Sequence, residues 1–156
     1  MAPRSQPAPP YRAETIAKWF VAYAEADDAD RSNLKVQKLL YYSQGHHLAQ
    51  TGLPLFSDPI QAWSHGPVVP VVYHQFKSFG SADVTLEPGD PFDWPDVDPK
   101  TTQLLIQVWE TYGQFGAWRL RNMTHAESPW RDHFSDSRNV EIPTSEMERF
   151  FKARVA

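Results

Sequence analysis

Six histidines are the side chains in this sequence that are best suited to metal binding or acid–base catalysis. They are His46, His47, His65, His74, His125 and His133. On a helix, the adjacent His46 and His47 would point about 100° apart, so they could not share one ion. The H-E-x-x-H spacing of zinc proteases is absent. The histidines therefore predict no metal site.

The triplet His125-Ala126-Glu127 matches only part of a known catalytic signature, the H-x-E of zinc deaminases. That signature also needs P-C-x-x-C, and this chain has no cysteine. Phosphate loops, G-x-S-x-G and G-x-G-x-x-G are absent too. We therefore expect no catalytic residue and no cofactor. The alternative hypothesis is a small enzyme that uses His65 and His125, with an acidic loop at residues 81–98 binding a divalent ion.

Two short stretches combine a histidine and a tryptophan at a turn before a helix. One is His125 to Trp130, and the other consists of Trp63, Ser64, His65, Gly66 and Pro67. The simpler interpretation is structural: Trp63 and Trp130 fill the core, and His125 bonds a backbone carbonyl. The alternative is a recognition surface, because aromatic anchors dominate the energetics of protein interfaces.

A central helix near residues 33–51 is expected to position these groups. Ser32 or Asn33 suits its N-cap, and Gly52 suits the left-handed residue after its end. Its apolar residues cover more than one face, which indicates neighbours on two sides. Gly45 in its interior costs about 1 kcal/mol relative to alanine, so we expect a bulky side chain to approach it closely.

The same helix carries three further candidates, Lys38, Tyr41 and Tyr42. The simpler interpretation puts Lys35 and Lys38 at its solvated edge and makes the tyrosines core residues whose hydroxyls reach a partner or water. The alternative makes Lys38, Tyr41 and Tyr42 part of a recognition surface.

Helical spacing and capping residues predict a mainly α, compact single-domain bundle of about six helices around the central one. These helices are expected over 13–26, Pro67–Phe79, Pro99–Gly113, Gly116–Met123, Ser128–Phe134 and a last segment that starts at Thr144 or Ser145 and includes a Ser145–Glu148 capping box. One or two short β segments are expected, at Ile60–Trp63 and Val84–Leu86. A polar loop is expected over residues 135–141.

Composition limits the possible partners and location. The net charge is −4 and there is no basic run, so we expect no nucleic-acid partner. No apolar run approaches the ~20 residues of a membrane span, and the first residues lack the apolar core of a signal peptide. Together with the lack of cysteine, this favours a cytoplasmic protein. Four prolines in the first ten residues predict a disordered arm over residues 1–12.

Three stretches resemble the signature blocks of the Panacea domain, an antitoxin family that includes SocA-like and phage-associated GepA-type proteins. They are L-K-V-Q-K-L-L-Y-Y-S-Q-G (Leu34–Gly45), A-W-S-H-G-P-V-V-P-V-V-Y-H-Q-F-K (Ala62–Lys77) and T-H-A-E-S-P-W (Thr124–Trp130). They occur in family order, and the resemblance extends over about Ile16 to Phe151. It implies a mainly helical fold with small β elements, which we expect over residues 13–154.

The resemblance also implies a function. It implies an antitoxin of a toxin–antitoxin system, with a role in phage defence, that neutralises a cognate protein toxin by direct protein–protein binding. The family marks no catalytic residue. Because the SocA-like branch hands its toxin to a protease, a proteolytic adaptor is an alternative. The residues expected at the toxin-binding site are Lys38, Tyr41, Tyr42, Trp63, His65, Gly66, Pro67, His125 and Trp130.

Overall fold

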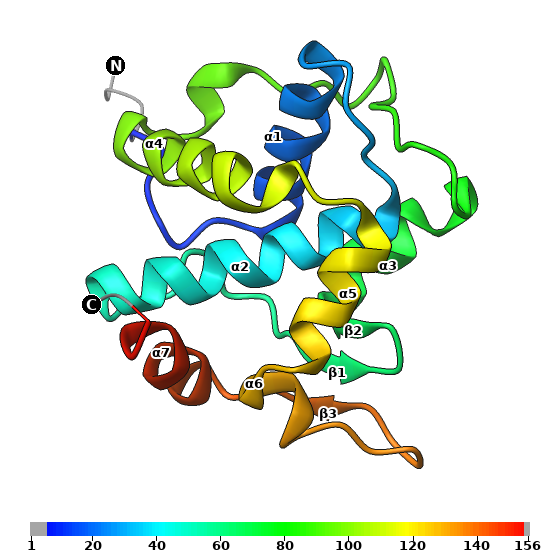
Figure 1. Ribbon diagram of the computed structural model, residues 1–156. Helices are drawn as coiled ribbons and strands as arrows, with labels where there is room; N and C mark the ends of the chain where they lie inside the picture. The colour runs from blue at the N-terminus through cyan, green and yellow to red at the C-terminus, as the bar shows by residue number, and fades with distance from the viewer. Residues whose placement is uncertain (1–5, 155–156) are drawn as a thin grey trace.

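Helix α2 (Asn33–Thr51) runs through the middle of the computed structural model, which describes residues 6–154 (Figure 1). In that view α1 and α4 lie on one side of α2 and α7 lies on the other. The remaining helices and strands are α1 (Ala13–Ala26), β1 (Gln61–Trp63), β2 (Gly66–Val68), α3 (Pro70–Phe76), α4 (Pro99–Val108), α5 (Ala117–His125), α6 (Ser128–Arg131), β3 (Val140–Glu141) and α7 (Thr144–Lys152). Tight turns occupy Lys77–Phe79 and Trp94–Asp96, and a π-helical turn occupies Trp109–Gly113. The predicted mainly α single domain is confirmed.

The ends of α2 follow from its capping residues. The Ser32 side chain accepts a hydrogen bond from the Lys35 N–H at 3.3 Å, which satisfies one of the free donors of the first turn. Gly52 ends the helix with φ of +75°, and its N–H bonds the Leu48 carbonyl. Fourteen of the nineteen residues of α2 are buried, so other elements surround it. The predicted central helix is confirmed.

Gly45 lets α7 approach the middle of α2. A methyl group at Gly45 would lie 2.1 Å from a ring carbon of Phe151, which is far inside van der Waals contact. The Phe151 ring also packs edge-on against Tyr41, at 5.5 Å between centroids. The bulky neighbour that Gly45 predicts is therefore Phe151.

A small antiparallel sheet corrects the predicted helix over Pro67–Phe79. The strand order is β2-β1-β3, and Ala62 of β1 pairs with Pro67 of β2. Val68 is the last residue of β2, which suits the high β propensity of valine. Helix α3 begins only at Pro70, where the missing N–H of proline costs no helical bond.

Three further predictions about local structure are wrong. The stretch Val84–Leu86 forms no strand; only an isolated bridge joins Ser32 to Asp83. Residues 135–141 end in β3, because Val140 pairs with β1. No side chain caps α7, whose N-cap is Pro143, so the predicted Ser145–Glu148 capping box does not form.

The predicted disordered arm over residues 1–12 is wrong at Tyr11. The Tyr11 side chain is buried, and its hydroxyl donates a 2.6 Å hydrogen bond to Asp98 at the start of α4. Its backbone N–H bonds the Leu55 carbonyl at 2.7 Å. Tyr11 therefore joins the N-terminal segment to the core. Residues 1–5 of the predicted arm lie outside the described residues.

Candidate functional site

The three stretches that carry the family resemblance meet at one end of α2. Helix α5 contacts both α2 and β2, and α2 contacts β2. Figure 1 shows α5 beside the β1–β2 hairpin, with α6 directly below it. The residues that these elements bring together form a largely buried polar cluster. It consists of Lys38, Tyr41, Tyr42, Arg121, Thr124, His125 and Glu127.

Lys38 lies inside this cluster, which corrects the prediction of a solvated lysine edge. Its side chain is fully buried, and Nζ donates to the Pro67 carbonyl at 3.1 Å. Lys35 is fully buried too, and its amine bonds Asp30 at 2.9 Å and the Gly113 carbonyl at 2.6 Å. Sequence spacing could not reveal this burial, because β2, α5 and α7, which pack against α2, are distant from it in the chain.

Lys38 differs from Lys35 in having no carboxylate partner among residues 6–154. Burial lowers the pKa of Lys38 to about 7, and the nearby positive charge of Arg121 acts in the same direction. Near neutral pH this amine is therefore poised between its charged and neutral forms.

Gly66 makes room for the Lys38 side chain. Its φ of +112° is a conformation that L-residues with a side chain rarely adopt. A Cβ at this position would lie 2.6 Å from Lys38 Cε and 2.9 Å from Thr124 Oγ1. The sequence Gly66-Pro67 thus both turns the hairpin and supplies the carbonyl that Lys38 binds.

Tyr41 and Tyr42 donate to a single carboxylate, that of Glu127. Their hydroxyls lie 2.9 Å and 3.0 Å from its two oxygens. Burial raises the pKa of Glu127, while the two tyrosine hydrogen bonds oppose that rise. Tyr42 also stacks on Tyr112 with ring centroids 3.8 Å apart. The prediction that both tyrosines are core residues with partnered hydroxyls is confirmed.

His125 and Trp130 connect this cluster to the hairpin. Their rings stack 3.8 Å apart, and Trp130 Nε1 donates to the Trp63 carbonyl at 2.7 Å. His125 Nε2 is buried without a hydrogen-bond partner in the described part of the chain. Burial lowers the pKa of His125, and the charges of Arg121 and Lys38 add to that effect.

Burial divides the nine predicted toxin-binding residues into two groups. The interior group consists of Lys38, Tyr41, Tyr42, Gly66, Pro67 and Trp130. His65 is exposed, and Trp63 and His125 are half-buried at the surface. Trp63 is thus less buried than the structural interpretation of its turn requires.

Sequence reasoning did not select Glu127, Thr124 or Arg121, all of which belong to the cluster. The first two lie in the T-H-A-E-S-P-W stretch, so their place in that block was the available signal. Arg121 precedes the block, and no spacing rule connects it with Lys38. Only the packing of α5 on α2 brings those two residues together.

His46, His47 and His133 have structural partners. His46 Nε2 lies 2.7 Å from the Tyr112 hydroxyl, and His47 Nδ1 lies 2.7 Å from the Leu53 carbonyl. Within residues 6–154, no group of three histidine or acidic side chains is arranged to hold a metal ion. No helix in this range is long and apolar enough to cross a membrane.

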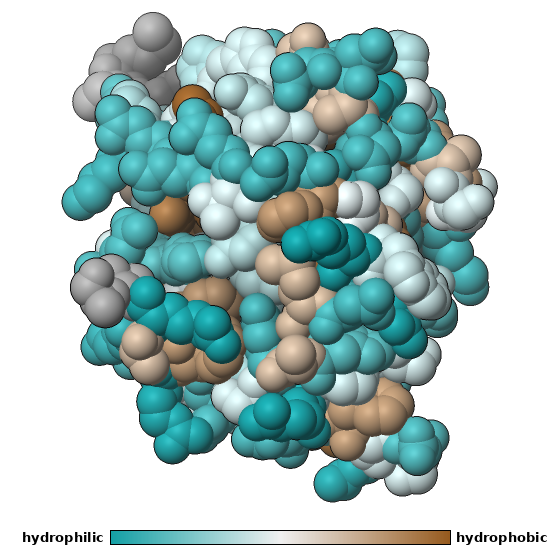
Figure 2. All heavy atoms as spheres, in the orientation of Figure 1, coloured by the Kyte–Doolittle hydropathy of each residue, from teal (hydrophilic) through white to brown (hydrophobic). Residues whose placement is uncertain are grey.

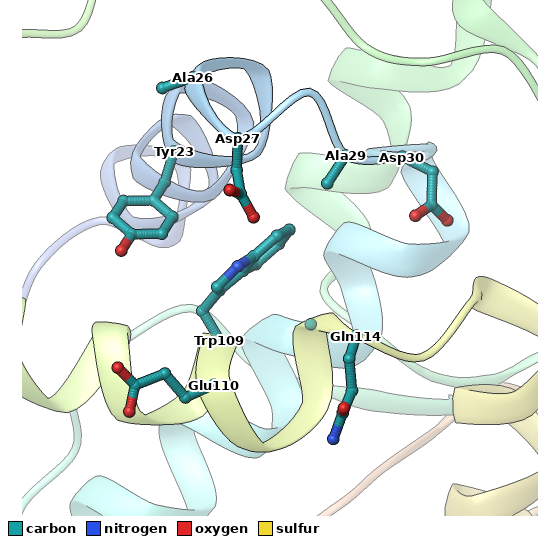
Figure 3. A pocket seen from close by; sticks show the side chains of 9 residues that line it. Tyr23, Ala26, Asp27, Ala29, Asp30, Trp109, Glu110 and Gln114 are labelled. Atoms are coloured by element: carbon teal, nitrogen blue, oxygen red, sulfur yellow. The ribbon is translucent and has the colours of Figure 1, made fainter.

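A separate cavity of about 670 Å³ lies between the end of α1 and the π-helical turn (Figure 3). Trp109 and Asp27 point toward each other across it. Lys35 lies beside it, with its amine 5.0 Å from the Trp109 ring centroid. None of the nine predicted toxin-binding residues lines this cavity.

Replacing Glu127 with alanine is expected to lower the free energy of unfolding by about 2–3 kcal/mol, because two buried tyrosine hydroxyls lose their acceptor. Urea unfolding followed by circular dichroism measures this. Adding Tyr42→Phe to the Glu127→Ala variant removes one orphaned hydroxyl, so the second substitution should cost less than it does in the wild type. Equal costs in the two backgrounds would contradict the shared-carboxylate network.

Comparison with known proteins identifies the family of this chain. A family model described as "Antitoxin SocA-like, Panacea domain" matches residues 36–131, a range that contains Lys38, Gly66 and Glu127. A curated relative, Antitoxin SocA of Caulobacter vibrioides (strain NA1000 / CB15N), is 40% identical over 139 residues, covering 83% of this chain and 74% of the relative. No solved structure matches the chain. The chain therefore belongs to the SocA-like antitoxin family that is defined by the Panacea domain.

Proposed function

We propose that this protein is the antitoxin of a toxin–antitoxin pair and neutralises a protein toxin in the cytoplasm by binding it directly. The observation that carries the proposal is the convergence of the three family stretches on one cluster, at the edge of which aromatic and histidine side chains reach the surface. Neither a cofactor nor catalysis is part of this role.

The proposed contact surface, called here the hairpin surface, comprises Trp63, His65, Tyr73 and His74. Trp63 packs edge-on against Tyr73, with ring centroids 4.9 Å apart, and Tyr73 contacts His74. His65 and His74 are exposed, and the two aromatic residues are half-buried. Aromatic side chains that are already held in place lose little conformational entropy on binding, which favours affinity.

The buried candidates support this surface from within. Lys38 holds the Pro67 carbonyl, and Trp130 holds the Trp63 carbonyl, so both fix the hairpin backbone. Tyr41 and Tyr42 hold Glu127, the residue that leads into α6. In this proposal the hairpin surface and His125 touch the toxin. Of the nine predicted residues, the interior ones, Lys38, Tyr41, Tyr42, Gly66, Pro67 and Trp130, position Trp63, His65 and His125.

Co-expression tests the antitoxin role. The gene adjacent to the one encoding this chain is induced in a host with and without this protein. Growth arrest by the neighbouring gene alone, relieved when both are present, is the expected result. A neighbour that is harmless alone, or equally lethal in both cases, refutes the proposal.

Trp63→Ala tests the hairpin surface. We expect at least ~30-fold weaker binding of the neutralised toxin by isothermal titration calorimetry, as for a typical aromatic hot spot. Trp94→Ala is the matched control, because Trp94 is also a surface tryptophan, 49% exposed, but lies in the turn before α4. Equal losses for the two variants would argue against this surface.

The two alternatives make different predictions. A proteolytic adaptor would fail to rescue growth in a protease-deficient host, whereas direct binding rescues it there. A histidine-dependent enzyme would lose function in His65→Ala or His125→Ala at an unchanged thermal midpoint, without losing toxin affinity. Calorimetry on the same two variants separates that outcome from loss of a binding contact.

A further inference from the structure

One face of α5 carries an exposed tryptophan next to an arginine that has no ion-pair partner among the described residues. Spacings of three and four residues place Trp118, Arg121, Asn122 and His125 on one side of the helix, called here the α5 face. Trp118 is 63% exposed. Although the whole chain has a charge of −4, α5 contains two arginines and no acidic residue. In Figure 2, strongly hydrophilic spheres lie directly beside hydrophobic ones over the position of α5.

The guanidinium of Arg121 is held in place by Trp118. Its central carbon lies 4.5 Å from the Trp118 ring centroid, and Nη1 donates to Asn122 at 3.1 Å. Stacking on an aromatic ring leaves the N–H edge of a guanidinium free for a planar acceptor. Arg121 Nε is buried without an acceptor, and no ion pair joins Arg121 to a carboxylate of residues 6–154.

The groups beneath the α5 face are also basic. Lys38 is fully buried next to Arg121, and His125 is acted on by the charges of Arg121, Lys38 and His65. These interactions lower the pKa of both Lys38 and His125, after the larger effect of burial. A negatively charged group at Arg121 would offset this repulsion, and the described residues supply none.

We infer that the α5 face binds an acidic segment of the protein partner. A carboxylate accepts a charge-assisted hydrogen bond from an outer nitrogen of the Arg121 guanidinium, and Trp118 packs against the segment. The inference rests on the proposed function, because the toxin is the partner concerned. Arginine and tryptophan are the residues most enriched at interface hot spots. An acidic protein segment fits better than nucleic acid, because the sequence has no basic run to neutralise a series of phosphates.

A peptide titration tests the inference directly. The probe is acetyl-(Glu)4-amide, followed by NMR through the indole N–H signal that Trp118→Phe removes. We expect a saturable shift with the wild type and about tenfold weaker binding by Arg121→Gln, the loss typical of one charge-assisted hydrogen bond. Acetyl-(Gln)4-amide should leave the signal in place.

Arg119→Gln is the matched control. Arg119 belongs to the same helix and stacks on Phe115 at the same 4.5 Å, but lies about 200° around the helix from Arg121. The affinity of the Arg119→Gln variant for the glutamate peptide should stay within about twofold of that of the wild type. Equal weakening of both variants, no response to the glutamate peptide, or tighter Arg121-dependent binding of the oligonucleotide (dT)8 overturns the inference.

The substitution itself should not unfold the protein. Arg121→Gln loses only an exposed hydrogen bond to Asn122 and the surface contact with Trp118, so its thermal midpoint should stay within about 4 °C of the wild type. Circular dichroism checks this before each titration.

The corresponding cellular test separates this inference from the antitoxin role. Arg121→Glu should fail to relieve growth arrest, while Arg119→Glu should relieve it as the wild type does. Relief by both variants overturns the α5 face and leaves the antitoxin role intact. If the wild type gives no relief, the proposed function fails, and the peptide titration still decides whether the α5 face binds an acidic segment.

Discussion

Gly45→Ala is expected to lower the free energy of unfolding by about 3 kcal/mol or more, near the upper end for overpacking a core. The added methyl group would lie 2.1–2.2 Å from two carbons of the Phe151 ring. That ring packs against Tyr41 and Tyr42, so it cannot move without disturbing the tyrosines that bind Glu127. Since a domain of this size has a stability of only about 5–15 kcal/mol, the loss would be easily measured by urea unfolding.

A double-mutant cycle shows whether contact with Phe151 is the cause. In a Phe151→Ala background the new methyl group has space, and alanine is favoured over glycine in a helix by about 1 kcal/mol. Gly45→Ala should therefore be neutral or stabilising there. Gly89→Ala is the control in the wild-type background, because no atom of residues 6–154 lies within 4 Å of a Cβ at Gly89. Destabilisation of the same size in both backgrounds would contradict the predicted clash.

Lys38→Met is expected to remove a large pH dependence of stability. In the unfolded chain Lys38 titrates near 10.5, the ordinary pKa of lysine, whereas burial lowers its pKa in the folded protein to about 7. Between these values the unfolded chain binds more protons, so the stability of the wild type should rise with pH from about 7 to about 10.5. This difference between the two pKa values of Lys38 corresponds to a change of about 5 kcal/mol in the free energy of unfolding, which is an upper figure for a single buried lysine.

The measurement compares urea unfolding of the wild type and Lys38→Met at pH values from 6 to 10. Methionine keeps the volume of the side chain but has no charge, so the difference between the two proteins isolates Lys38. The free energy of unfolding of Lys38→Met, relative to that of the wild type, should increase as the pH falls toward 7. Below pH 7 the difference between the two proteins should stay constant. Arg121→Gln should move the lower end of this window to higher pH, because one opposing charge is gone. Parallel pH profiles of wild type and Lys38→Met would show that Lys38 is not buried as described.

Local chemistry explains why part of the fold was predictable. Ser32 and Gly52 bound α2 through hydrogen bonds that involve only neighbouring residues, and Asp98 likewise caps α4 by accepting from the Thr101 N–H. Gly45 also carried long-range information, because a glycine inside a helix implies a close neighbour. The spacing alone could not identify that neighbour as Phe151, which lies more than a hundred positions away.

The hairpin shows where local rules conflict. The valines after Gly66 suit a strand, and the later aromatic spacing suits a helix, so the sequence is compatible with either at Pro67. Pairing with β1, which β3 completes from the other edge, decides in favour of the strand. Strand pairing is a long-range interaction, and for that reason the boundary at Pro70 could not be read from the segment itself.

Of the candidate site, the sequence by itself determined which stretches matter, because three motif blocks in order identify the family. It also determined that α2 is central, through its caps and its two apolar faces. Only the tertiary structure decided that Lys38 is buried without a counter-ion among the described residues, that Glu127 is the shared acceptor of Tyr41 and Tyr42, and that Arg121 belongs to the same cluster. Burial and charge proximity depend on elements that are distant in sequence, so they arise when the helices pack and not before.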